Sequence, residues 1–214
     1  MIAMLLAAGR GERLRPLTDT TPKALVEVHG QSLLERHLLA LQAAGFETVV
    51  INLGWLGEKI VDRVGSGSAY GLNVVYSPEG DNVLETGGGI VRALPMLGQR
   101  PFLVVNADIY TDMPMPPTEL EPGTSGKLIL VATPEYREQG DFDLIDGRVR
   151  NVATASLTFS GVAIYRPEFF VGCSPGRFSI VPMLRRAADA NQLAGEFYAG
   201  RWADAGTPER IAAI

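Results

Sequence analysis

A short apolar segment that runs directly into a glycine- and arginine-rich loop is the feature that most constrains this chain. Residues Ile2 to Ala7 are apolar, and they open into the segment LLAAGRGERLRPLTDTTPKAL, which spans residues 5–25. An apolar run bounded by glycine predicts a buried parallel strand that ends in a loop. Ligands of open α/β sheets bind outside the carboxyl ends of the strands, so we expect a binding site at this loop.

Alternating strand and helix patterns follow this first strand. Ser32 and Glu35 have capping-box spacing, a leucine stripe follows them, and Gly45 is suited to end the helix. The alternation predicts a Rossmann-like, doubly wound and mostly parallel α/β sheet. Beyond the helix at 32–45, we predict strands at 48–52, 72–76 and 102–106, and helices at 57–64 and 88–97.

The pattern changes after about Asp112, where a proline-rich stretch begins. Asp146-Gly147 lies between two short apolar segments and is typical of a two-residue hairpin turn. We expect a strand at 157–165, a helix at about 180–190 and a short terminal element at 202–208. The chain is therefore predicted to be one domain, 1–214, with a β-rich second half (113–214) packed on the first half (1–112).

Composition limits the partners of the protein. Apolar residues make up 46% of the chain, which indicates a globular protein. The 19 basic and 24 acidic residues give a net charge of −5 without a basic run, so nucleic acid is not an expected partner. Cys173 is the only cysteine, and no apolar segment has the length of a membrane span. We expect a cytoplasmic protein without membrane association; oligomeric state is left open.

The glycine- and arginine-rich loop has the composition of a phosphate site. Its backbone N–H groups can bind phosphate oxygens, and Gly9 and Gly11 allow the main chain to approach closely. The segment matches neither the dinucleotide-binding fingerprint nor the P-loop motif, because Leu14 stands where the former requires glycine. A solvated loop with ordinary surface arginines is the alternative interpretation.

The same segment resembles the signature of the sugar-1-phosphate nucleotidyltransferases, G-x-G-x-R-x-x-P-L-T followed by P-K. This resemblance implies a GT-A-like fold with a small β-rich sugar-binding insertion, and nucleotidyl transfer from a nucleoside triphosphate to a sugar 1-phosphate. By the resemblance, Gly11, Glu12 and Arg13 hold the triphosphate, and Lys23 contacts the phosphates of both substrates. The matching positions are Gly9, Gly11, Arg13, Pro16, Leu17, Thr18, Pro22 and Lys23.

A second glycine-rich segment, LETGGGI at residues 84–90, precedes the predicted helix at 88–97. Three consecutive glycines at a helix start indicate that the backbone closely approaches something else. In the family this segment surrounds the nucleobase, and Glu85 and Gly88 resemble base-recognition positions. A glycine-rich helix cap with a surface carboxylate is the alternative.

Two aspartates are predicted to bind magnesium. Asp108 follows the apolar strand at 102–106, so its carboxylate should emerge at the ligand-binding edge of the sheet. Asp204, in WADAGT, resembles the family's late W-x-D-x-G-T element, which supplies a second carboxylate. Oxygen ligands suit Mg²⁺. A capping aspartate near a turn is the alternative for each.

Sugar-phosphate contacts are predicted at Asn106, Asp141 and Ser160. Asn106 lies beside Asp108, while Asp141 and Ser160 fall in segments, GDF and TFSGVAIY, that resemble stretches near the sugar in the family. A turn aspartate and a bulged strand interior explain Asp141 and Ser160 without a ligand. Both histidines, His29 and His37, are predicted to be structural.

Within the family, LETGGG, NAD, GDF and the absence of a C-terminal repeat domain most resemble the branch that transfers UMP to N-acetylmuramate 1-phosphate in peptidoglycan recycling. Two departures from the wider family are the missing E-K-P element and Ala107-Asp108 in place of a G-D pair. A GTP-dependent mannose- or heptose-1-phosphate guanylyltransferase would share the same phosphate and metal residues. A non-catalytic nucleotide-sugar sensor should have lost Arg13, Lys23, Asp108 or Asp204, all of which are present.

Overall fold

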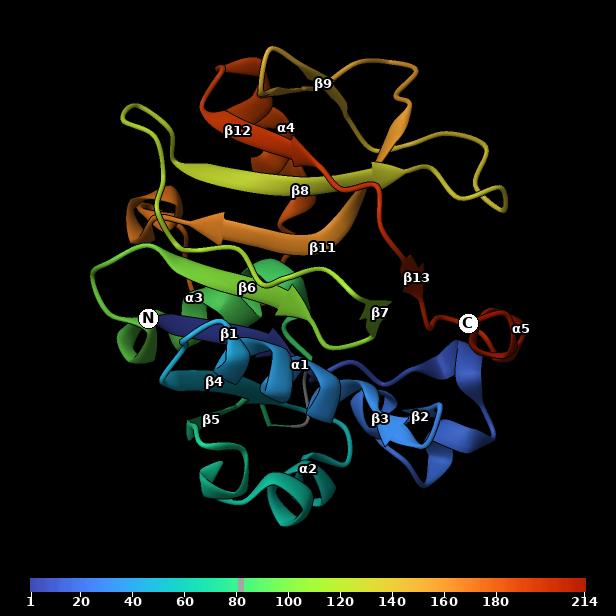
Figure 1. The fold of residues 1–214 in the computed structure, drawn as a ribbon. Coiled ribbons are helices and arrows are strands. Elements are labelled where there is room, and N and C mark those ends of the chain that lie inside the picture. The colour runs from blue at the N-terminus through green and yellow to red at the C-terminus, as the bar shows by residue number, and fades with distance from the viewer. Residues whose placement is uncertain (81–82) are drawn as a thin grey trace.

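The computed structural model describes residues 1–80 and 83–214. Within these residues one nine-stranded sheet runs through the molecule in the order β5-β4-β1-β6-β11-β8-β12-β10-β9 (Figure 1). Its strands are β1 (Ile2–Leu6), β4 (Thr48–Leu53), β5 (Asn73–Pro78), β6 (Phe102–Asn106), β8 (Gly126–Ala132), β9 (Asp143–Ile145), β10 (Arg148–Arg150), β11 (Leu157–Tyr165) and β12 (Leu193–Phe197).

The first half of the chain builds the parallel part of this sheet. β5, β4, β1 and β6 are parallel neighbours, connected through helices α1 (Leu33–Ala43), α2 (Gly57–Val64) and α3 (Glu85–Leu97). β11 then pairs antiparallel with β6, and β8 pairs antiparallel with β11. The predicted doubly wound α/β fold is confirmed. The β-rich second half, however, extends the same sheet instead of packing on it as a separate layer.

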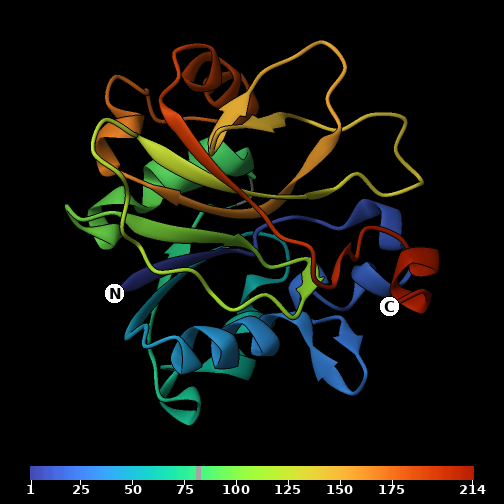
Figure 2. The same ribbon diagram turned by 45° about the horizontal axis from the view of Figure 1, so that its top comes forward.

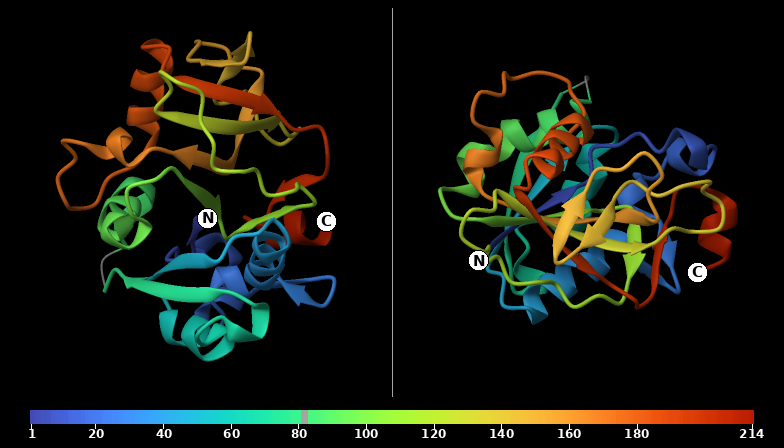
Figure 3. Two further views of the ribbon diagram at one scale, coloured as in Figure 1. Left: turned by 60° about the vertical axis from the view of Figure 1, so that its left-hand side comes forward. Right: turned by 90° about the horizontal axis from the view of Figure 1, so that it is seen from above.

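Helices cover both faces of the sheet, as its edge-on view shows (Figure 3, left). One apolar cluster joins α1 and α2 to alternate strand residues such as Ala3 and Leu5, and a second joins α3 and α4 (Val181–Asp189) to Met4. This alternation is the period of two expected of a strand buried on both faces. No helix in the described ranges is long and apolar enough to cross a membrane.

A short strand pair brings the chain's C-terminal region to the carboxyl edge of β6. β7 (Ile109–Thr111) follows β6 directly, and β13 (Trp202–Asp204) pairs with it antiparallel (Figure 2). The remaining elements are β2 (Glu27–Val28), β3 (Gln31–Ser32), α5 (Pro208–Ala212) and the 3₁₀ helices Glu12–Leu14, Leu17–Asp19, Lys23–Leu25, Ser68–Tyr70 and Pro167–Phe170.

Local sequence signals that have a defined geometry are reproduced closely. The Ser32 hydroxyl oxygen accepts the Glu35 backbone N–H at 3.3 Å, so Ser32 caps α1 as predicted. Asp146 and Gly147 have φ of 50° and 71° and join β9 to β10, which confirms the two-residue hairpin. β8, β12, the β2–β3 pair and the pairing of β7 with the predicted terminal element were not predicted from the sequence, and α3 begins at Glu85, three residues before the predicted start at Gly88.

Glu35 ties α1 to the segments that follow it. Its carboxylate accepts hydrogen bonds from Arg63 Nε (3.0 Å), Tyr70 Oη (2.9 Å) and Ser32 Oγ (2.7 Å). Burial alone would raise the pKa of Glu35, but the hydrogen bonds from Arg63, Ser32 and Tyr70 outweigh it and lower the pKa to about 2. The ionised carboxylate therefore stabilises the contact between α1 and the 63–70 region.

This contact predicts an acid-dependent loss of stability. Because the pKa of Glu35 is lower in the folded chain, its contribution is present above the ordinary value near 4.5 and is lost as pH falls toward 2. Glu35→Gln should lower the free energy of unfolding at pH 7 by up to about 3 kcal/mol. The difference from wild type should shrink below pH 4 in urea unfolding; a constant difference across that range would contradict this role.

Candidate active site

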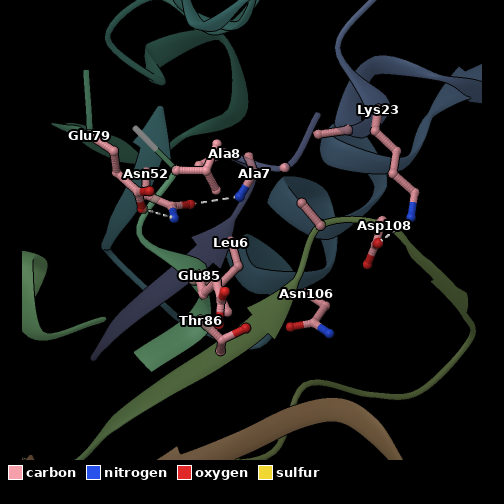
Figure 4. Close-up of a pocket in the computed structure, with 14 residues that line it drawn as sticks. Leu6, Ala7, Ala8, Lys23, Asn52, Glu79, Glu85, Thr86, Asn106 and Asp108 are labelled. Atoms are coloured by element: carbon pink, nitrogen blue, oxygen red, sulfur yellow. Dashed lines mark hydrogen bonds and ion pairs between the residues drawn. The ribbon is translucent and has the colours of Figure 1, made fainter. Parts of the chain in front are cut away.

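Two adjoining cavities lie at the carboxyl edge of the parallel strands, and Figure 4 shows the smaller one. Their volumes are about 180 and 950 Å³. Both are lined by Gly9, Lys23, Val83 and Asp108, so they form one continuous cleft. The smaller is also lined by Leu6, Ala7, Ala8, Ala24, Asn52, Glu79, Glu85, Thr86, Asn106 and Ala107, and the larger by Arg10, Gly11, Glu12, Arg13, Leu84, Arg177 and Gly206.

The loop after β1 keeps its shape because of Gly11. Gly11 has φ +64°, and a Cβ added there would lie 2.9 Å from Thr18 Cγ2 and 3.1 Å from Lys23 Cβ. The Thr18 hydroxyl donates to the Gly11 carbonyl at 2.8 Å and closes the loop. A side chain at residue 11 is therefore excluded by both backbone conformation and packing. Arg10, Glu12 and Arg13 are exposed on this loop and line the larger cavity.

The larger cavity concentrates positive charge in an acidic protein. Arg10, Arg13, Lys23 and Arg177 line it, against the carboxylates of Glu12 and Asp108. The whole chain carries a net charge of −5, so this excess of cations is local. Such a surface suits a polyanionic ligand with several phosphates.

Lys23 and Asp108 form an ion pair at the junction of the two cavities, with Lys23 Nζ on Asp108 Oδ2 (Figure 4). Lys23 comes from the 3₁₀ turn Lys23–Leu25, and Asp108 from the turn between β6 and β7. The Lys23 side chain is 12% exposed and that of Asp108 is 36% exposed. The Asp108 carboxylate thus emerges at the ligand-binding edge of the sheet, as predicted.

The β7–β13 pair brings Asp204 next to this region, but its side chain lines neither of the two cavities; it lines a neighbouring cavity of about 790 Å³ with Tyr136 and Arg210. Its Cα lies opposite Ile109, and the Ala205 N–H donates to the Asp108 carbonyl at 2.9 Å. A Cβ added at Gly206 would lie 3.1 Å from Arg13 Nη2 and would collide with Asp204 Oδ1. The structure therefore brings Arg13, Asp108 and Asp204 together from segments about a hundred or more residues apart along the chain.

The Asp204 carboxylate is held by three donors. Arg210 Nη1 (2.5 Å) and the Gly206 N–H (3.0 Å) donate to Oδ1, and the Tyr136 hydroxyl (2.5 Å) donates to Oδ2. Burial alone would raise the pKa of Asp204, but the hydrogen bonds from Tyr136 and Arg210 and the charges of Arg210 and Lys23 lower it. Asp204 is therefore an anion at neutral pH, and the pKa of Tyr136 is raised to about 12, first by burial and then by Asp204.

The carboxylate oxygens in this region are the type of ligand that suits magnesium. Mg²⁺ is typically held by one or two carboxylates together with substrate phosphates and water. The described residues give Asp108 Oδ1 no hydrogen bond, whereas both oxygens of the ionised Asp204 carboxylate already accept hydrogen bonds, and Asp204 lines the neighbouring cavity. In residues 1–80 and 83–214 no three His, Cys, Asp or Glu side chains form a metal cluster. The site suits a cation that binds together with its phosphate ligand.

The three glycines of LETGGGI approach other parts of the same chain. The N–H groups of Gly87 and Gly88 donate to the Phe178 carbonyl at 3.1 and 3.2 Å, and a Cβ at Gly88 would collide with the Gly176 carbonyl. The predicted close approach is real, but its partner at Gly88 is the 176–178 segment. Glu85 lines the smaller cavity with φ 60°, and Arg177 Nε donates to its carboxylate at 2.9 Å.

The three predicted sugar contacts differ in their surroundings. Asn106 lines the smaller cavity, and its amide lies over Gly161 in the bulge of β11. Asp141 lines neither cavity; Arg137 binds it through two hydrogen bonds of 2.7 and 3.0 Å. The Ser160 hydroxyl is fully buried and donates to the Ile129 carbonyl at 2.7 Å. Ser160 therefore shapes the bulge, and its hydroxyl is directed into the sheet instead of the cleft.

Several residues that line the cleft or hold Asp204 were not predicted from the sequence. Asn52 and Glu79 follow from the same rule that found Asp108, because each stands at or just beyond the carboxyl end of a parallel strand. Tyr136, Arg177 and Arg210 lie in loops or in a short helix, without a local pattern that would single them out.

Comparison with known proteins agrees with this geometry. Residues 2–139 match the family model described as nucleotidyl transferase. The chain is 49% identical to N-acetylmuramate alpha-1-phosphate uridylyltransferase of Neisseria meningitidis serogroup B, over 99% of this chain and 95% of the relative. It is 36% identical to the Caulobacter vibrioides protein of that name, over 97% and 93%. The crystal structure of HddC from Yersinia pseudotuberculosis superimposes with a TM-score of 0.80 at 20% identity, covering 99% and 96%. With the family model matching well over half of its length, the chain belongs to the nucleotidyl transferase family.

Proposed function

We propose that this protein transfers the uridylyl group of UTP to N-acetylmuramate 1-phosphate, releasing pyrophosphate and UDP-N-acetylmuramate. The continuity of the two cavities carries the proposal. A nucleoside in the smaller cavity would have its phosphates enter the larger one beside Lys23 and Asp108, which line both. The α-phosphate would then lie at the junction beside Lys23 and Asp108, with Arg13 on the wall of the larger cavity.

The chemistry requires alignment and charge neutralisation. An oxygen of the sugar phosphate attacks the α-phosphorus, the new P–O bond forms, and the bond to the β-phosphate oxygen breaks as pyrophosphate leaves. A phosphate monoester has a second pKa of about 6, so the attacking oxygen is already ionised at neutral pH. No general base is needed, which agrees with the position of His37, buried in α1 with its ring on the Ile109 carbonyl.

Different residues would align the substrates and neutralise their charge. Gly9, Gly11 and Glu12 shape the loop that receives the triphosphate, and Arg13 stabilises the charge that develops at the α-phosphate. Lys23 neutralises both phosphate-bearing substrates and holds Asp108. Asp108 and Asp204 would hold Mg²⁺, which supplies Lewis-acid stabilisation of the phosphate oxygens when bound.

The base and the sugar are assigned on different grounds from the phosphates. The assignment of UTP and N-acetylmuramate rests on the 49% identity to a protein of that activity over nearly the whole chain. We propose that Glu85 and Gly88 contribute to base binding. They lie in the nucleotide-binding half, 1–112, on which the 176–178 segment packs. We propose that Asn106 and Asp141 contact the sugar phosphate. Asp141 lies in the sugar-binding half, 113–214, and Asn106 lies just before it. The proposed route is peptidoglycan recycling in the cytoplasm.

A substrate matrix tests this function. Pyrophosphate release should be measured with four nucleoside triphosphates crossed with N-acetylmuramate, N-acetylglucosamine, glucose and mannose 1-phosphates, with and without Mg²⁺. We expect the highest kcat/KM for UTP with N-acetylmuramate 1-phosphate, and activity that EDTA abolishes. Turnover with GTP and mannose 1-phosphate alone would instead assign a guanylyltransferase.

Arg13 provides a direct test of the phosphate site. Arg13→Ala should lower kcat roughly 10²-fold or more, because it removes one preorganised cation from the transition state. The side chain is exposed, so the variant should keep its thermal stability. Arg15→Ala is the matched control, since Arg15 is an exposed arginine of the same loop that pairs with Asp19 and lines neither cavity. An active Arg13→Ala enzyme would remove Arg13 from the mechanism.

Asp108 provides the corresponding test of the metal site. Asp108→Asn should lower kcat by roughly 10²-fold and raise the Mg²⁺ concentration needed for half-maximal activity, because it removes a charged ligand. Asp112→Asn is the control, since Asp112 lies four residues away and accepts the Arg201 N–H at 2.8 Å outside the cleft. An unchanged Mg²⁺ titration in Asp108→Asn would show that Asp108 is not a metal ligand.

A further inference from the structure

A buried pair of polar side chains, Asn52 and Glu79, forms the inner wall of the smaller cavity (Figure 4). We infer that this pair is a positioning device: it fixes the distance between the two backbone segments that enclose the nucleobase, and so sets nucleotide affinity and selectivity. The inference rests on the proposed function, which places the base in this cavity. Neither residue needs to touch the reacting phosphates.

The pair connects both sides of the cavity through three hydrogen bonds. Asn52 Oδ1 accepts the Ala7 N–H at 2.6 Å, and Asn52 Nδ2 donates to Glu79 Oε1 at 2.7 Å. Glu79 Oε2 accepts the Leu84 N–H at 2.7 Å. Ala7 is the first residue beyond β1, and Leu84 is the residue before α3. A continuous chain of hydrogen bonds thus runs from the loop after β1 to the start of the glycine-rich helix.

Gly89 makes room for this arrangement. A Cβ on Gly89 would lie 2.6 Å from Glu79 Oε1 and 3.0 Å from Asn52 Nδ2. Gly89, the third glycine of LETGGGI, therefore allows close packing against the Asn52–Glu79 pair, while Gly87 and Gly88 allow close packing against the 176–178 segment. The glycines let helix α3 close directly onto the polar pair.

The identity of each side chain follows from its partners. Glu79 faces two donors, the Asn52 amide and the Leu84 N–H, so a carboxylate satisfies both, whereas a glutamine would turn its NH₂ toward one of them. Asn52 faces one donor and one acceptor, which matches an amide but not a carboxylate. Both residues are almost fully buried, with 3% and 7% exposure, so little water can reach a mismatched pair.

This pattern allows a reciprocal exchange. Glu79→Gln creates a donor–donor conflict, and Asn52→Asp creates an acceptor–acceptor conflict with a second buried charge. In the double variant Asn52→Asp/Glu79→Gln, the carboxylate introduced at position 52 would accept from both the Ala7 N–H and the amide introduced at position 79. The oxygen of that amide would accept the Leu84 N–H. The hydrogen-bond chain and the total charge are then restored with the same number of heavy atoms.

The experiment compares wild type, both single variants and the double variant by steady-state kinetics and by calorimetric UTP binding. Each single variant should weaken UTP binding and raise KM for UTP about tenfold, with a smaller change in kcat and reduced preference for UTP over CTP and GTP. The double variant should return these values to within about threefold of wild type. Gly89→Ala, which crowds the same pair, should reproduce the single-variant effect if a charge-altered variant does not fold.

Glu35→Gln is the stability control, because it breaks a comparable network between α1 and α2 outside the cleft. It should lower the melting temperature without changing KM for UTP. Single variants that lose only melting temperature would overturn the inference and leave a purely structural pair. A double variant that binds UTP no better than Glu79→Gln would also overturn it, because the Glu79 charge would then act on the base directly. Wild type that neither binds UTP nor releases pyrophosphate would sink the proposed function itself.

Discussion

The pairing of β7 with β13 is the constraint on which the site depends. β6 ends at the ligand-binding edge of the sheet, and β7 continues from it through Asp108. Because β13 pairs with β7 in register, Asp204 lies opposite Ile109, and its backbone neighbour Ala205 donates to the Asp108 carbonyl. Two carboxylates that are distant in sequence are therefore held by main-chain hydrogen bonds, which depend little on side-chain conformation.

Cationic side chains lie next to Asp108 and Asp204 and offset the repulsion between negative charges. Two carboxylates close together repel each other and repel an incoming polyphosphate. Lys23 pairs with Asp108, and Arg210 with Asp204, so each anion has its own counter-charge. Arg10 and Arg13 line the larger cavity beyond these pairs, and Arg177 pairs with Glu85. The larger cavity thus keeps an excess of cations, which would draw in a triphosphate despite the net charge of −5.

The sequence reveals those parts of the molecule that depend on local geometry. The Ser32 cap, the Asp146-Gly147 turn and the loop at Gly11 each require particular residues at fixed spacing, and the structure has all three. Contacts between distant side chains leave no such pattern. The hydrogen bonds from Tyr136 to Asp204 and from Arg177 to Glu85, which join residues 68 and 92 positions apart, are examples. Ser160 shows the converse, since a motif match gave no information on which way its hydroxyl points.

The glycine-rich segment at 84–90 combines a local sequence pattern with contacts to residues distant in the sequence. Its sequence predicts close approach but not the partner, and the structure divides the partners between Gly176, Phe178 and the Asn52–Glu79 pair. All of these partners belong to the protein itself, so contacts within the chain account for the three glycines. The cationic loop after β1 carries exposed arginines and is held by the Thr18–Gly11 hydrogen bond and by hydrogen bonds from Trp55 and Lys59. If the smaller cavity holds the base, as proposed, a wall formed by contacts within the chain would reject a poorly fitting ring without a prior ordering cost.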